Sequence, residues 1–306
     1  MKALVTGSSG FLGHYLVKEL NKKGIEIVCF DQQIPYPKLV SHYSGKNVHF
    51  VQGDLLNKEV LLSAMEGCDL VFHTAAIADI DKAKMLPVQT MEVNVVGTAK
   101  CLECAKETGV KRFLFASTVY TAGSWGSFYR VSKQAGESLC KTFHNEFGLN
   151  YTILKYGSLY GKEANHWNFI YRVCKDLLTK GEYTYISSPN SVREYIHIQD
   201  AARETIRIAQ DSEFENKIAL ISGHQRMTVK EFFDMVQEII GKKCIINYTP
   251  DEEHRHYIIT PYKFESEIPV RINLSTYVDI SEGILECLNY VQNEINGNCN
   301  SQKEEC

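Results

Sequence analysis

The stretch KALVTGSSGFLG, residues 2–13, places a short apolar run directly before a glycine-rich turn and the start of a helical pattern. The run is typical of a buried strand, and the spacing over Phe11–Lys23 is typical of an amphipathic helix. Glycines between strand and helix permit a tight turn and close approach of a pyrophosphate, which the helix N-terminus attracts. The stretch therefore predicts a dinucleotide-binding turn. The residues expected to contact the cofactor here are Gly7, Gly10, Phe11, Leu12 and Gly13.

Asp31 indicates which dinucleotide is bound. It follows the next apolar run, Glu26–Phe30, and lies 18 residues after Gly13. A carboxylate at that place can accept hydrogen bonds from both ribose hydroxyls of the adenosine half, and it repels a 2′-phosphate. Gln32 and Gln33 offer such a phosphate no positive charge. NAD is therefore favoured over NADP as the cofactor, and a solvated turn aspartate is the alternative interpretation of Asp31.

The alternation of apolar runs and helical segments continues through the first half of the chain. Runs that are apolar on both faces and joined by helices predict an α/β fold with a doubly wound parallel sheet of the Rossmann type. The later runs are Val48–Val51, Leu70–His73, Arg112–Ala116 and Tyr151–Leu154.

The regular alternation of apolar runs and helical segments ends after about Gly157, which predicts a second part of the molecule. We expect residues 1–157 to form the NAD-binding domain, with 190–222 returning to it. Residues 158–189 and 223–295 should form a smaller substrate-binding part, with helices at Val229–Ile240 and Thr276–Val291. The polar residues 296–306 are expected to be a disordered tail.

Composition excludes several classes of function. The chain has 306 residues, a formal net charge of −4 and no basic stripe, so no nucleic-acid partner is expected. No apolar run reaches the roughly 20 residues of a membrane span, and the first strand leaves no room for a signal peptide, so we expect a cytoplasmic protein. Cysteines in that compartment stay reduced. Cys101 and Cys104 lack a second pair of ligands, so we interpret them as helix-packing residues and expect no metal site.

Tyr129 and Lys133 lie four residues apart, on one face of a predicted helix. Ser117 and Thr118 precede them at the end of the fifth apolar run, where open α/β sheets bind ligands. A tyrosine hydroxyl has a pKa of about 10 in water, which a neighbouring ammonium and the nicotinamide charge would lower. Tyr129 can then move a hydroxyl proton while hydride moves to or from the nicotinamide. The alternative interpretation is a half-buried tyrosine beside a solvated lysine.

Several residues that follow strands are expected beside the cofactor. Asp54 follows the third run and is placed to hold the adenine edge. Ala75 and Ala76 follow the fourth run, and their small side chains let the cofactor lie against the backbone. The expected cofactor-binding set is completed by Leu55, Asn94, Ser117, Tyr129, Lys133 and Tyr156.

Seven motifs occur together in about the first 200 residues: Gly7–Gly13, Asp31, Asp54-Leu55, His73–Ala76, Asn94–Thr98, Tyr129–Lys133 and Arg193–Asp200. In this combination the chain resembles the extended short-chain dehydrogenase/reductases, the NAD-dependent epimerase/dehydratase family. The resemblance implies a hydride-transfer triad of Thr118, Tyr129 and Lys133, with Asn94 supporting the active-site helix. It also implies that Arg193 binds the diphosphate of a nucleotide sugar, and it places Ser158 and Thr118 among the substrate-binding residues.

Departures from the family pattern narrow the reaction. Dehydratases of the family carry an acidic pair after the catalytic Thr, and similar decarboxylases carry Glu at the second place, whereas this chain has Val119 and Tyr120. We therefore expect a nucleotide-sugar epimerase that acts at carbon 4 through a transient keto sugar. A nucleotide-sugar dehydrogenase or ketoreductase with the same triad is the alternative, and a non-catalytic NAD-sensing protein is the third hypothesis.

Two further features bear on partners and substrate. The resemblance implies a homodimer formed by helices over Val88–Lys106 and Phe128–Phe147. Ser158 stands where the family often has an Asn that touches the sugar diphosphate, and Thr260-Pro261-Tyr262 departs from the family's usual ending. The identity of the sugar is therefore the least constrained part of the prediction.

Overall fold

The computed structural model describes residues 1–33, 47–224, 226–250, 257–259 and 268–301. The chain divides into two compact units. The first comprises Met1–Gly157, Ala201–Ser222 and Pro261–Ile272, and the second comprises Ser158–Asp200, Gly223–Thr260 and Asn273–Cys306. Residues 190–200, which we expected to return to the first unit, belong to the second. The atypical segment Thr260-Pro261-Tyr262 lies outside the described residues.

The first unit is built on an eight-stranded sheet with the strand order β13-β10-β6-β5-β4-β1-β2-β3. All neighbouring strands in it are parallel. The order reverses where β1 pairs with both β2 and β4, which confirms the predicted doubly wound α/β fold. The strands are β1 (Lys2–Thr6), β2 (Glu26–Asp31), β3 (Val48–Gln52), β4 (Leu70–His73), β5 (Arg112–Thr118), β6 (Tyr151–Tyr156), β10 (Lys217–Ile221) and β13 (Val270–Arg271).

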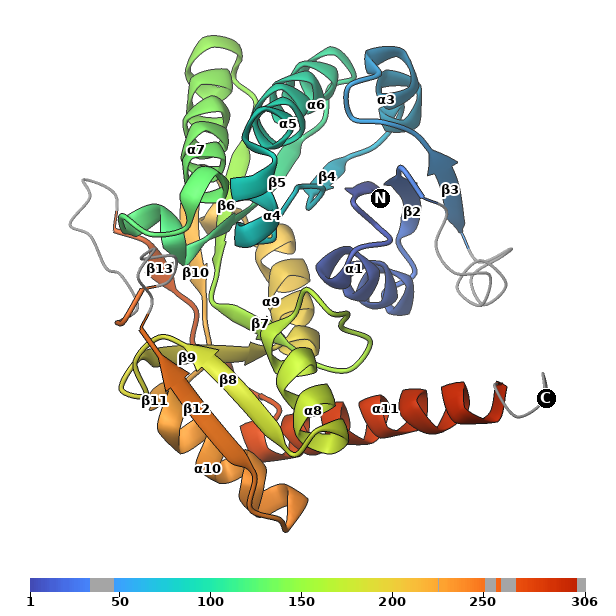
Figure 1. The fold of residues 1–306 in the computed structure, drawn as a ribbon. Helices are drawn as coiled ribbons and strands as arrows, with labels where there is room; N and C mark the ends of the chain where they lie inside the picture. The colour runs from blue at the N-terminus through green and yellow to red at the C-terminus, as the bar shows by residue number, and fades with distance from the viewer. Residues whose placement is uncertain (34–46, 225, 251–256, 260–267, 302–306) are drawn as a thin grey trace. The chain divides into compact units, whose positions relative to one another are not determined.

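Helices cover both faces of this sheet. Helices α3, α6 and α7 gather on one face, and α1 and α9 lie on the other (Figure 1). On the first face, Leu61, Cys101 and Phe115 belong to one buried apolar cluster, and Cys104 is also fully buried. The elements are α1 (Phe11–Lys22), α3 (Lys58–Met65), α4 (Ile80–Met85), α5 (Pro87–Met91), η1 (Glu92–Val96, a π-helix), α6 (Gly97–Glu107), η2 (Val119–Ala122), α7 (Ser127–Phe147), α9 (Ile198–Gln210) and η3 (Ser212–Phe214).

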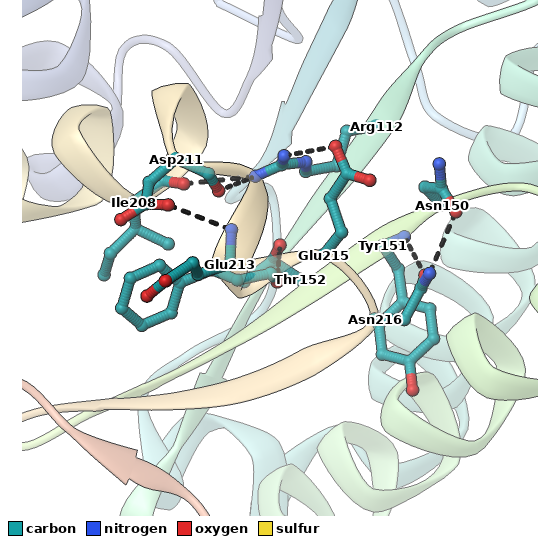
Figure 2. A network of polar contacts seen from close by, with 10 residues as sticks. Arg112, Asn150, Tyr151, Thr152, Ile208, Asp211, Glu213, Glu215 and Asn216 are labelled. Carbon is teal, nitrogen blue, oxygen red and sulfur yellow. Dashed lines mark hydrogen bonds and ion pairs between the residues drawn. The ribbon is translucent and has the colours of Figure 1, made fainter.

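The buried Arg112 anchors the returning segment 201–222 to the sheet (Figure 2). Its Nη1 donates hydrogen bonds to the carbonyls of Ile208 (3.1 Å) and Asp211 (2.9 Å), at the C-terminal end of α9. Its Nη2 lies 2.5 Å from Glu215 Oε1. A cation at a helix C-terminus is stabilised by the unpaired carbonyls and the helix dipole. The contact therefore fixes α9 against the start of β5.

The second unit, in its described residues, contains two small sheets and three helices. One sheet has the order β11-β9-β7, and in the other β12 pairs with β8. Aromatic side chains fill much of its core, among them Tyr160, Tyr195, Phe232 and Phe233. The elements are β7 (Ser158–Tyr160), α8 (Phe169–Thr179), β8 (Glu182–Ile186), β9 (Val192–His197), β11 (Arg226–Thr228), α10 (Val229–Ile240), β12 (Ile245–Thr249) and α11 (Ile280–Ser301).

Helix α11 differs from the sequence prediction at both ends. It begins at Ile280 rather than Thr276, because Asp279 Oδ1 accepts the Ser281 N–H (2.9 Å) and so caps the first turn. It continues to Ser301, so residues 296–301 are helical and not part of a disordered tail; residues 302–306 lie outside the described residues. None of the helices in the described part of the chain is long and apolar enough to cross a membrane.

Candidate active site

The turn after β1 requires glycine at two places. Gly7 has a φ of +70°, and a Cβ there would lie 2.7 Å from the backbone of Ala75. A Cβ on Gly13 would lie 2.1 Å from the carbonyl oxygen of Gly7. Helix α1 begins after Gly10 without a side-chain cap, so its first N–H groups are not covered by a side chain of the turn. The turn thus has the shape and the donors that a pyrophosphate needs.

The carboxylates of Asp31 and Asp54 are held by neighbouring donors. Asp31 accepts the N–H groups of Ser9 (2.9 Å) and Gln33 (3.1 Å), which fixes it beside the glycine turn. Asp54 accepts the Leu56 N–H (2.8 Å) and the side-chain amide of Gln32 (3.0 Å). Asp31 is partly exposed and Asp54 is exposed, so a ligand can reach both carboxylates. The neighbouring side chain of Leu55, in contrast, is buried.

His73 links the glycine turn to the helices beyond β4. Its Nδ1 lies 2.8 Å from the Thr6 hydroxyl, and its Nε2 lies 2.9 Å from the Thr98 hydroxyl. Thr98 donates its own hydrogen to the carbonyl of Asn94 (2.6 Å), so His73 carries its proton on Nε2. Burial lowers the pKa of His73 to about 3, which keeps the ring neutral. Ala75 and Ala76, two and three residues later, are partly exposed.

Asn94 holds the helix that carries Tyr129. Its side-chain amide donates to the carbonyl of Ile77 (3.0 Å) and to the Ser132 hydroxyl (2.9 Å), and it accepts the Ile77 N–H (2.8 Å). Ser132 in turn donates to the carbonyl of Tyr129 (2.8 Å). Asn94 lies in the π-helix η1, an irregularity that often marks functional sites. Since both amide hydrogens are used in these contacts, the structure gives Asn94 a supporting position and not a cofactor contact.

The structure brings Thr118, Tyr129 and Lys133 together at the end of β5. The Thr118 side chain lies close enough to Tyr129 to lower its pKa. Lys133 is buried, and its Nζ lies 6.0 Å from the centre of the Tyr129 ring and donates to the carbonyl of Ala116 (2.7 Å). A hydroxyl pair beside a buried ammonium is suited to moving a proton to or from a substrate oxygen.

Burial opposes the charged forms of both Tyr129 and Lys133. It raises the pKa of Tyr129 to about 12, although the hydrogen bond with Thr118 lowers it. Burial also lowers the pKa of Lys133 to about 8. We expected the Lys133 ammonium to lower the pKa of Tyr129, but in this structure the pKa is raised, and burial is the main cause. Tyr129 therefore needs a further positive charge close to its hydroxyl before it can act as a base at neutral pH.

Two expected cofactor contacts point into the protein instead. Ser117 is buried and donates its hydroxyl hydrogen to Glu137, and the Tyr156 hydroxyl lies 2.7 Å from that of Thr205. Both side chains are therefore engaged within the first unit. Glu137 did not emerge from the sequence, although its position four residues after Lys133 places both on one face of α7.

Arg193, in the second unit, is buried and already has several partners. Its Nη1 donates to the carbonyls of Val192 (3.0 Å) and Tyr257 (2.7 Å), and its Nη2 donates to the Tyr185 hydroxyl (3.1 Å). The guanidinium also lies 4.5 Å from the centre of the Tyr257 ring. A diphosphate bound by Arg193 would have to share or replace these contacts. Ser158 is half-buried in β7, opposite Tyr195 of β9.

Comparison with known proteins identifies the family. The NAD dependent epimerase/dehydratase family matches residues 3–221. The chain belongs to this family. It is therefore an enzyme of the family, and NAD is its cofactor.

Its relatives include both epimerases and decarboxylases. The chain is 25% identical over 315 residues to a UDP-glucuronate 4-epimerase of Thermodesulfobacterium geofontis, covering 95% of this chain and 96% of the relative. It is 26% identical over 296 residues to a UDP-N-acetyl-alpha-D-glucosaminuronate decarboxylase of Bacillus cytotoxicus, covering 88% of each. A mutant form of UDP-glucuronic acid 4-epimerase from Bacillus cereus has the same fold, with a TM-score of 0.85 at 23% identity over 96% of this chain and all of that one.

The first unit of this family member fits NAD. The uncapped start of α1 suits the pyrophosphate, and the fixed carboxylate of Asp31 suits a ribose with a free 2′-hydroxyl. Gln32, which bonds Asp54, adds no charge for a 2′-phosphate. Among the described residues no cluster of metal-ligating side chains occurs.

Proposed function

We propose that the protein is an NAD-dependent nucleotide-sugar 4-epimerase. The observation that supports this most strongly is the assembled group of Thr118, Tyr129 and Lys133, followed by a turn without acidic side chains. Elimination of water needs an acid and a base after the catalytic threonine, and that place holds Val119 and Tyr120. Relatives that span nearly the whole chain include 4-epimerases.

In the proposed reaction, the chain positions one sugar hydroxyl and moves its proton. NAD, held at Gly7–Gly13 and Asp31, would supply the acceptor for a hydride from the sugar carbon and the donor for its return to the opposite face of the sugar. Tyr129 removes the hydroxyl proton and later returns it, while Thr118 hydrogen-bonds the same oxygen. Lys133 contributes the positive charge that favours the phenolate over the phenol. Asn94 and Ser132 keep Tyr129 in place by fixing the turn of α7 that carries it.

Arg193 is proposed to bind the diphosphate of the substrate, with Ser158 as a weaker contact. Its planar guanidinium suits bidentate binding of phosphate oxygens. A nucleotide-sugar dehydrogenase or ketoreductase would use the same triad, so it remains the second candidate. A decarboxylase is less favoured because Tyr120 stands where similar decarboxylases carry Glu.

One experiment separates these candidates. Purified protein is incubated without added NAD with UDP-glucose, UDP-glucuronate, UDP-N-acetylglucosamine or dTDP-glucose, and the products are identified by proton NMR. A 4-epimerase that retains NAD converts at least one of them into its C4 epimer, with no net oxidation. An oxidised or decarboxylated product, or turnover only with stoichiometric NAD, would contradict the proposal.

We also propose that the protein is a homodimer joined through α5, η1 and α7. Apolar side chains on these helices are exposed: Val88 (70%), Val96 (47%), Phe128 (40%), Val131 (38%) and Phe147 (54%). Apolar surface of this extent on neighbouring helices is typical of a subunit interface. Light scattering at micromolar concentration should give twice the mass of the chain, and a monomer would contradict the dimer.

A further inference from the structure

A largely buried ion pair, formed by Lys155 and Glu137, lies one helical turn from Lys133. Lys155 on β6 and Ser117 on β5 are direct neighbours in the sheet. Both contact the same carboxylate: the Ser117 hydroxyl donates to Glu137 Oε1, and Lys155 Nζ forms an ion pair with Glu137 Oε2 at 3.3 Å. The side chains of Lys155 and Glu137 are only 3% and 12% exposed. Removing two charges from water costs free energy, so the burial of this pair calls for an explanation.

The position of Glu137 relates this pair to Lys133. Glu137 and Lys133 are one helical turn apart on the same face of α7. Lys133 donates to the carbonyl of Ala116, and Lys155 is paired in the sheet with the next residue, Ser117. Gly136 lets α7 approach closely, because a Cβ there would lie 2.3 Å from the Phe115 ring.

Few other charges act on Lys133 at neutral pH in the described part of the chain. His73 faces it from β4, and burial keeps that ring neutral. Cys140 and Tyr129 face it from α7, and burial raises the pKa of both groups well above neutrality. Burial lowers the pKa of Lys133 to about 8, whereas Cys140 and then Glu137 raise it; of these two groups only Glu137 carries a charge at neutral pH. Glu137, with Lys155 as its partner, is therefore the anion that keeps Lys133 protonated.

We infer that Glu137 and Lys155 are positioning residues that together set the charge on Lys133, and through it the readiness of Tyr129 to exchange a proton. This inference rests on the proposed function, since it assigns the pair to the proposed proton transfer. Glu137 favours the ammonium form of Lys133 by its negative charge. Lys155 limits that effect, because it neutralises the same carboxylate.

The two partners must then act in opposite directions. In Glu137→Gln the carboxylate is lost and the Lys155 ammonium remains, so Lys133 loses its proton at lower pH. In Lys155→Met the carboxylate has lost its other cation, so Lys133 keeps its proton to higher pH. Each shift should be about one pH unit, the usual effect of one nearby charge. A pair that only packs the core would impair both variants in the same direction.

The test measures two quantities in the wild type, Glu137→Gln, Lys155→Met and the double variant. One is the pH profile of kcat, whose alkaline limb reports loss of the Lys133 proton. The other is the pH titration of the Tyr129 phenolate by ultraviolet difference absorbance with NAD bound, taken against Tyr129→Phe. The double variant guards against misfolding, because it removes the Glu137–Lys155 pair as a whole and leaves neither of these two residues as an unpaired charge.

The inference predicts an alkaline limb shifted to lower pH in Glu137→Gln, to higher pH in Lys155→Met, and between the two in the double variant. With NAD bound, the pH at which Tyr129 forms its phenolate should differ between Glu137→Gln and the wild type. Unshifted limbs, or shifts of the same sign in both single variants, would overturn it. If no nucleotide sugar is turned over but the phenolate titration still shifts, the proposed function fails and the role of the pair stands.

Discussion

The surroundings of Tyr129 and of Arg193 differ in how their polar groups are used. Around Tyr129, neighbouring groups fix the backbone and leave the side chain beside Thr118. Around Arg193, the guanidinium itself is occupied by two carbonyls, a hydroxyl and an aromatic ring. The first arrangement holds a reactive atom ready. In the second, the guanidinium would have to exchange partners in order to bind a diphosphate in the proposed way.

This difference changes what a substitution should do. A contact that supports Tyr129 helps the reaction, so its loss should slow the chemical step. A contact that occupies Arg193 competes with the substrate, so its loss should tighten binding.

Tyr129→Phe should lower kcat by roughly 10²–10⁴-fold, because it removes the group that moves the proton and leaves the ring in place. NAD binding should survive, which can be measured by fluorescence titration of the purified variant. Activity above about a tenth of the wild-type rate would show that Tyr129 is not the acid–base group.

Arg193→Ala should weaken binding of a nucleoside diphosphate by about 10- to 150-fold, since charge-assisted hydrogen bonds contribute roughly 1.5–3 kcal/mol. The measurement is calorimetry with NAD present. Affinity for NAD should hardly change, because the residues suited to its pyrophosphate lie at Gly7–Gly13 in the first unit. Equal affinity of the variant and the wild type for the diphosphate would remove Arg193 from the site.

Replacing Asp31 with Ser and Gln32 with Arg should shift the cofactor preference toward NADP by about tenfold or more. The change removes a repulsive carboxylate and adds a phosphate partner. Dissociation constants for NAD and NADP, measured for both proteins, check this. A wild type that already binds NADP more tightly would show that Asp31 has been assigned the wrong role.

Tyr185→Phe should give the smallest effect, and its direction shows whether a contact that occupies Arg193 opposes substrate binding. The variant loses the hydroxyl that accepts from Arg193 Nη2 while the ring remains. If that hydroxyl competes with the substrate, affinity for a nucleoside diphosphate should rise by about fivefold, corresponding to about one hydrogen bond. A weaker affinity would mean that Tyr185 orients Arg193 for binding, as the groups around Tyr129 do for catalysis.

Sequence alone predicted the features that depend on local spacing. The doubly wound sheet follows from apolar runs, the glycine turn from residues 7–13, and the pairing of Tyr129 with Lys133 from a four-residue interval. Each of these depends on neighbours within a few residues, so periodicity and spacing suffice to identify it.

Features set by contacts between distant segments could not be predicted in this way. Tyr257 contacts Arg193 across 64 residues of chain, and Lys155 on β6 reaches Glu137 because α7 packs against β5 and β6. The direction of a strand side chain raises the same difficulty. Tyr156 was expected at the cofactor, and its hydroxyl instead bonds Thr205, because the register of β6 and the place of α9 decide where it points.

The most direct test of the account follows a single hydrogen atom. A nucleotide sugar that is turned over is prepared with deuterium at carbon 4 and incubated with the enzyme in ordinary water without added NAD. Reversible hydride transfer, with Tyr129 moving only the hydroxyl proton, predicts a C4 epimer that keeps its deuterium, as read by proton NMR and mass spectrometry. Loss of deuterium to the solvent, or release of an oxidised sugar, would contradict the proposed epimerase.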